Sequence, residues 1–133
     1  MIRAALAHLV LGFTLGAVVL WSKGTGHDAA VWGWRAPHAE FLLIGWTAQL
    51  VLGVALWIFP RRRLGSLPYG RVELAWAGFV LINAGVALVA LGANVTAPGG
   101  DWLGVAGRVL EAGAVVACAA NLWGRVRPGL SQM

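Results

Sequence analysis

Four long apolar stretches constrain the fold of this chain more than any other feature of its sequence. They cover residues 4–22, 39–59, 72–93 and 102–124. A helix that crosses the hydrocarbon core of a bilayer needs roughly 20 residues, so each stretch has the length of a transmembrane helix. We therefore predict an all-α fold, an integral membrane four-helix bundle, that occupies residues 1–133 as a single domain.

The composition supports this prediction and excludes one obvious alternative. Only 11% of the residues are charged, whereas soluble domains carry about 25%. The net charge is +5, but most of the basic residues flank apolar stretches and do not form the patch that a nucleic acid requires. Those at the flanks are Arg3, Arg61, Arg62, Arg63, Arg71, Arg125 and Arg127. We therefore expect the lipid bilayer as a partner, and no nucleic acid.

The distribution of these arginines also predicts the orientation of the chain. All seven lie near the N-terminus, in the segment 60–71 or near the C-terminus. Because Lys and Arg accumulate on the cytoplasmic side of membrane proteins, we predict an N-in, C-in topology with loops 23–37 and 94–101 outside. The expected location is a bacterial or archaeal inner membrane, which the chain would cross as a multi-pass protein.

Ionisable residues inside apolar stretches are the first candidates for a functional site, because burying a charge in a bilayer is costly. Arg108 and Glu111 are three residues apart, so one interpretation is a helical ion pair that neutralises both. In the other interpretation Glu111 faces Glu40 and His38 across the outer leaflet. Carboxylates and imidazole in such a cluster could bind a metal or carry protons. The sequence leaves both interpretations open.

Glycines recur on the first two apolar stretches beside histidines. Gly12 and Gly16 follow His8 at intervals of four residues, and Gly45 and Gly53 lie on nearly one face of the second stretch. Small residues let helices approach closely in lipid, which is one interpretation. The other is that the glycines form a slot for a flat macrocycle.

The second stretch resembles a known helix. The pattern His38, Gly45-Trp46, Gly53 and Pro60-Arg61 is similar to the second transmembrane helix of the main subunits of heme-copper oxidases and nitric oxide reductases. Residues 3–16 also resemble the first helix of that superfamily. The resemblance implies that His38 is an axial ligand of haem b, and we expect the four glycines to admit the porphyrin. The family has many more helices and histidines than this chain, so reduction of oxygen or nitric oxide by this chain alone is not expected.

The second axial ligand is the open point of this hypothesis. His8 and His38 fall on opposite sides of the membrane in the predicted topology, roughly 20 Å apart at ~1.5 Å per residue. The ligand would then come from His38 of a second copy, from His27 or from a weak ligand such as water, or the coordination position would stay open.

Three functions follow from these observations. The first is a homo-oligomeric haem b protein for electron transfer or diatomic gas sensing. The second is a non-catalytic small subunit of a larger respiratory or photosynthetic complex. The third is a metal or proton site built from His38, Glu40 and Glu111.

Overall fold

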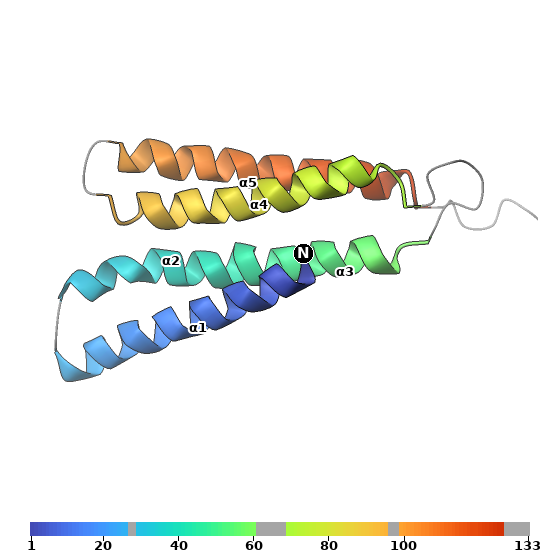
Figure 1. The fold of residues 1–133 in the computed structure, drawn as a ribbon. Helices are drawn as coiled ribbons and strands as arrows, with labels where there is room; N and C mark the ends of the chain where they lie inside the picture. The colour runs from blue at the N-terminus through green and yellow to red at the C-terminus, as the bar shows by residue number, and fades with distance from the viewer. Residues whose placement is uncertain (27–28, 61–68, 96–98, 127–133) are drawn as a thin grey trace, which may run out of the picture.

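The computed structural model describes residues 1–26, 29–60, 69–95 and 99–126, and this part of the chain is helical with short connections (Figure 1). The elements in chain order are α1 (Ile2–Thr25), the 3₁₀ helix η1 (Ala29–Trp34), α2 (Arg35–Glu40), the π-helix η2 (Phe41–Ala48), α3 (Gln49–Ile58), α4 (Val72–Gly92) and α5 (Gly100–Trp123). Arg61, Arg62, Arg63, Arg127 and His27 lie outside the described residues.

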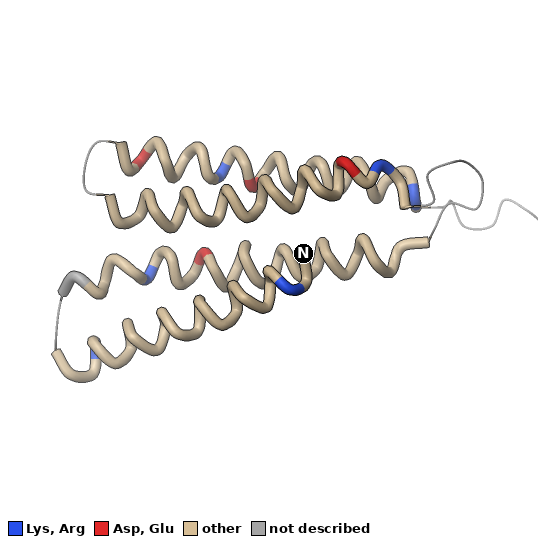
Figure 2. The backbone as a smooth tube through the Cα atoms, in the orientation of Figure 1, with Lys and Arg blue, Asp and Glu red and all other residues tan. Residues whose placement is uncertain are grey.

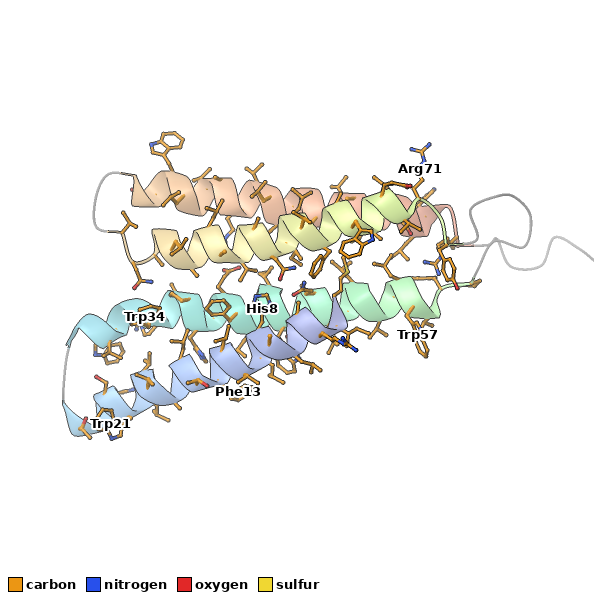
Figure 3. The ribbon with its side chains drawn as sticks, in the orientation of Figure 1. His8, Phe13, Trp21, Trp34, Trp57 and Arg71 are labelled. Atoms are coloured by element: carbon orange, nitrogen blue, oxygen red, sulfur yellow. The ribbon has the colours of Figure 1, made fainter. Side chains whose placement is uncertain are left out.

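Four helical segments are long and apolar enough to cross a membrane, as the sequence predicts. They are Ile2–Thr25, Val31–Ile58, Val72–Gly92 and Gly100–Trp123. Large hydrophobic side chains cover their outer surfaces, which suits contact with lipid. Figure 3 shows Trp21 and Trp34 near one end of the molecule and Trp57 near the other, the distribution expected of interfacial aromatic residues.

The second span begins earlier than the sequence predicts. Residues 23–37 were expected to form a loop, but η1 starts at Ala29 and α2 at Arg35. Pro37 does not prevent this, because a proline in the first turn of a helix removes an N–H that has no partner there. Within this span η2 has the wider π geometry, and the Thr47 hydroxyl donates a 2.9 Å hydrogen bond to the Leu42 carbonyl, five residues earlier.

Helices α4 and α5 form a closely packed antiparallel hairpin with glycines at the contact. Gly78, Gly85 and Gly92 recur every seven residues on α4, and Gly100 and Gly107 continue the same spacing on α5. A Cβ atom at Gly85 would lie 2.8 Å from the Gly107 carbonyl oxygen. The two backbones are therefore nearly in contact, which only small residues permit.

The first hairpin pairs α1 with the continuous α2–η2–α3 helix, and this helix lies between α1 and the second hairpin (Figure 1). The fold is thus two hairpins side by side, with α1 on the outside of one of them.

Arg125 connects the two hairpins at the end where α3 stops. It is 2% exposed and donates hydrogen bonds to the carbonyls of Leu56 (2.9 Å), Pro60 (3.3 Å) and Phe59. A helix leaves its last carbonyls without intrahelical partners, and Pro60 cannot continue α3. The guanidinium therefore caps α3, although the sequence suggested only a flanking charge at this position.

Candidate functional site

Two glutamates and an arginine from both hairpins form an ion cluster. Arg108 Nη1 lies 3.0 Å from Glu40 Oε1 and 2.9 Å from Glu111 Oε2, and Arg108 Nη2 lies 2.6 Å from Glu40 Oε2. The structure thus contains the helical Arg108–Glu111 pair and also brings Glu111 to the same guanidinium as Glu40. The ion pair of the first interpretation and the proximity of Glu111 to Glu40 in the second therefore occur together.

The cluster is buried on its acidic side and open on its basic side. The Glu40 and Glu111 side chains are 4% and 8% exposed, whereas the Arg108 side chain is 56% exposed. A groove of about 640 Å³ on the surface of α4 and α5 reaches Arg108, and Asp101 and Gly104 also line it. Figure 2 shows how few charges lie along the helices away from their ends.

One carboxyl oxygen of the cluster lacks a donor. Glu111 Oε1 is buried and has no hydrogen-bond partner in the described part of the chain, and the Glu40 and Glu111 carboxyl groups share the Arg108 guanidinium as a partner. Ionised carboxylates only accept hydrogen bonds, so a bond between the two groups requires a proton. Two carboxylates and one guanidinium sum to a charge of −1. One added proton makes the cluster neutral and supplies the missing donor.

His38 does not belong to this cluster. Its Nδ1 atom lies 2.7 Å from the Gly12 carbonyl oxygen on α1, whereas Glu40, two residues later, contacts α5. No three His, Cys, Asp or Glu side chains among the described residues are close enough to hold a metal ion. The structure therefore brings together two members of the predicted metal or proton site, Glu40 and Glu111, and places the third against α1.

His8 makes the corresponding contact in the other direction, from α1 to the second helix (Figure 3). Its Nδ1 atom is 3.1 Å from both the Gly45 carbonyl oxygen and Gln49 Oε1, and its ring stacks on Phe41 at 5.5 Å. Both partners accept hydrogen bonds, so Nδ1 carries the proton. Gln49 is fully buried and its Nε2 atom has no described partner.

The two histidines are closer in depth than the sequence suggested. His38 packs against Gly12 and Gly16 of α1, only one to two helical turns from His8, or about 10 Å along the axis. The predicted 20 Å was too large because α1 continues to Thr25 and the second span starts before His38. Each ring is nevertheless fixed by a different backbone carbonyl.

All four glycines that were expected to admit a porphyrin contact side chains of the facing helix. A Cβ atom at Gly12 would lie 2.6 Å from Leu42, at Gly16 2.5 Å from His38, at Gly45 2.7 Å from His8 and at Gly53 2.9 Å from Met1. This arrangement favours the interpretation of close helix contact. A macrocycle has no room between α1 and the second helix, so a haem bound to His38 would have to lie outside the contact between these two helices.

Comparison with protein-family models, curated proteins and solved structures finds no match to the chain. The resemblance to heme-copper oxidases and nitric oxide reductases therefore stays a prediction. The same holds for His27 as a second axial ligand.

Sequence reasoning missed Gln49 as the partner of His8. The signal was available, because Gln49 is a polar residue inside an apolar stretch and follows Gly45 by one helical turn. What the sequence could not supply was which histidine faces it.

Proposed function

We propose that this chain is a proton-binding membrane protein in which Glu40, Arg108 and Glu111 take up and release one proton. The observation that supports this most strongly is the buried Glu111 Oε1 atom, which has no described donor and belongs to a carboxyl group that shares the Arg108 guanidinium with Glu40. Carboxyl pairs that share a proton are an established way to hold an exchangeable proton.

The arrangement suggests how proton binding would act on the protein. Glu40 belongs to the first hairpin, while Arg108 and Glu111 belong to the second. Uptake of a proton from water changes the charge of the cluster from −1 to zero, and its release restores the negative charge. Each transfer changes the attraction between the hairpins, so the cluster would couple protonation to their packing.

The groove over α4 and α5 opens the Arg108 guanidinium of the cluster, though neither glutamate, to the surface. It runs from Asp101, in the first turn of α5, to Arg108, about 10 Å along the helix. In the proposed N-in, C-in orientation this end of α5 faces outward, so the proton would exchange with the outer compartment.

Infrared difference spectroscopy tests the proposal directly. A protonated carboxyl group has a carbonyl stretch that an ionised one lacks, and we expect this band in the protein in lipid at neutral pH. Glu111→Gln should abolish it. Glu73→Gln is the matched control, because Glu73 is an exposed glutamate of α4 and its replacement should leave the band intact. Absence of the band from the unaltered protein would reject the proposal.

Haem b binding by His38 is a second candidate, favoured by one observation. The Nδ1 atom of His38 is hydrogen-bonded to the Gly12 carbonyl, which leaves Nε2 unprotonated in the neutral ring, as in metal-binding histidines. Bound haem would supply electron transfer or gas binding. In a homo-oligomer, His38 of a second copy would complete the coordination. The test is a Soret band in the purified protein that His38→Ala abolishes.

The proposed setting is a bacterial or archaeal inner membrane, where the chain could also belong to a larger redox complex. Exposed aromatic and aliphatic side chains on every span fit lipid or another membrane protein equally well. Purification in a mild detergent separates these cases, because a small subunit should co-purify with its complex, whereas a homo-oligomer should migrate as a multiple of 14.0 kDa.

A further inference from the structure

A second groove lies on the other side of the α2–η2–α3 helix from the ion cluster. It is formed where the outer half of α1 meets η1 and α2, and it has a volume of about 700 Å³. Phe13 and Leu20 form part of its apolar wall, Lys23, Trp32 and Arg35 lie toward its polar end, and His38 lies at the level of Gly12 and Gly16, near Phe13. We call this feature the outer groove.

The charged residues that line the outer groove in the described part of the chain, Lys23 and Arg35, are both positive. Lys23 lies in the last turn of α1 and Arg35 at the start of α2. The Arg35 guanidinium lies 5.0 Å from the centre of the Trp32 ring, which positions it by a cation–π contact. The described residues that line the groove include no carboxylate. Two cations therefore face one space without a described negative partner there.

The remaining wall is apolar and open to the side. Phe13 is 60% exposed and Leu20 69% exposed, and both belong to a helix that is long and apolar enough to span the membrane. A soluble anion would interact with the cationic end alone. A ligand that matches the whole groove carries negative charge at one end and a hydrocarbon chain at the other.

We propose that the outer groove binds an anionic phospholipid. Its phosphate is held by Lys23 and Arg35 at the membrane interface, and one acyl chain lies along α1 past Leu20 and Phe13. Basic residues near a membrane surface attract anionic lipids, and the groove adds a defined place for the chain. This site is separate from the proton-binding cluster and does not depend on it. Because His38 lines the outer groove, a bound lipid would compete with a haem that His38 binds from this groove.

Native mass spectrometry of the purified full chain tests the site, with phosphatidylglycerol and zwitterionic phosphatidylcholine as probes. We expect phosphatidylglycerol to be retained preferentially. The double variant Lys23→Gln/Arg35→Gln should weaken its binding about tenfold or more, since each basic residue contributes on the order of a fewfold. The double variant Arg3→Gln/Arg71→Gln, which removes two exposed arginines outside the groove, is the charge-matched control and should have no effect.

Two further measurements separate the groove from general surface attraction. Ala17→Phe fills the groove from an exposed position of α1 and keeps both cations, so it should also reduce retention of phosphatidylglycerol. Excess inorganic phosphate should not displace the lipid. Equal retention of the two lipids, full retention by Ala17→Phe, displacement by phosphate, or a Soret band that depends on His38 would each overturn the proposal.

Discussion

Arg108 binds Glu40 through both terminal nitrogens of its guanidinium, at 3.0 and 2.6 Å, and so joins α5 of one hairpin to α2 of the other. The two partners differ sharply in environment, because the Glu40 side chain is 4% exposed and that of Arg108 is 56% exposed. A bidentate pair of this kind is stronger and more directional than a single contact. The relative orientation of the two hairpins at this level therefore depends on an ion pair whose carboxylate is buried and whose guanidinium reaches the surface.

Replacement of Arg108 by leucine should destabilise the protein strongly. It leaves the buried carboxyl groups of Glu40 and Glu111 without a cation, and loss of one partner of a buried pair costs about 3–5 kcal/mol. The triple variant Arg108→Leu/Glu40→Gln/Glu111→Gln removes the unpaired acids and should recover much of that loss. Reversible unfolding in mixed micelles measures the free energy of unfolding of both variants. A triple variant no more stable than Arg108→Leu would show that packing of the arginine stem dominates.

The packing of α4 on α5 should be sensitive to a single methyl group at Gly85. An alanine Cβ there would lie 2.8 Å from the Gly107 carbonyl oxygen and 2.7 Å from Glu111 Cγ, so the helices must separate. Overpacking of this kind costs about 1–3 kcal/mol. Gly104→Ala is the matched control, because no atom lies within 4 Å of its added Cβ and alanine favours the helix. Thermal unfolding in detergent should show a lower midpoint for Gly85→Ala alone.

The cap that Arg125 provides should protect the end of α3. Arg125→Gln loses the hydrogen bonds to Leu56 and Pro60 and leaves carbonyl groups at the helix end without their charged donor. We expect a loss of about 2–3 kcal/mol and faster hydrogen exchange of the amides in the last turn of α3. Amides of α1 serve as the internal reference. Unchanged exchange at the end of α3 would assign the stabilisation of that end to Pro60 and lipid instead.

The four spans could be predicted because membrane thickness fixes helix length and apolar composition marks each helix. The start of the second span could not be predicted, because Pro37 and the tryptophans before it suit a loop as well as a 3₁₀ turn that leads into a helix. The Arg108–Glu111 pair was predictable from its spacing on one helix. The contact between Arg108 and Glu40 spans 68 positions and depends on how the hairpins meet, which local sequence does not specify.

The glycines show the same limit at the candidate haem site. Their spacing predicts a smooth helix face, but it does not specify what lies against that face. In the structure Gly16 receives His38 and Gly45 receives His8, so each helix places a histidine on a glycine of the other. The seven-residue spacing of Gly78, Gly85 and Gly92 was also visible in the sequence, and it would have predicted the close α4–α5 contact.

The orientation of the chain is the last prediction, and single cysteines can test it. The N-in, C-in topology places the end of α1 outside and the end of α5 inside, because arginines accumulate at the latter. Gly24→Cys introduces a thiol in the last turn of α1, where no atom lies within 4 Å of an added Cβ. Val126→Cys introduces a thiol just after α5, at a residue that is 56% exposed. The parent chain carries only the buried Cys118 and serves as the unlabelled control.

A membrane-impermeant maleimide should label Gly24→Cys in intact cells, whereas Val126→Cys should react only after the membrane is permeabilised. The reverse pattern would show that the basic segments face outward. It would also place the Asp101 end of the groove beside Arg108 on the cytoplasmic side, so the proposed proton exchange would then occur with the cytoplasm.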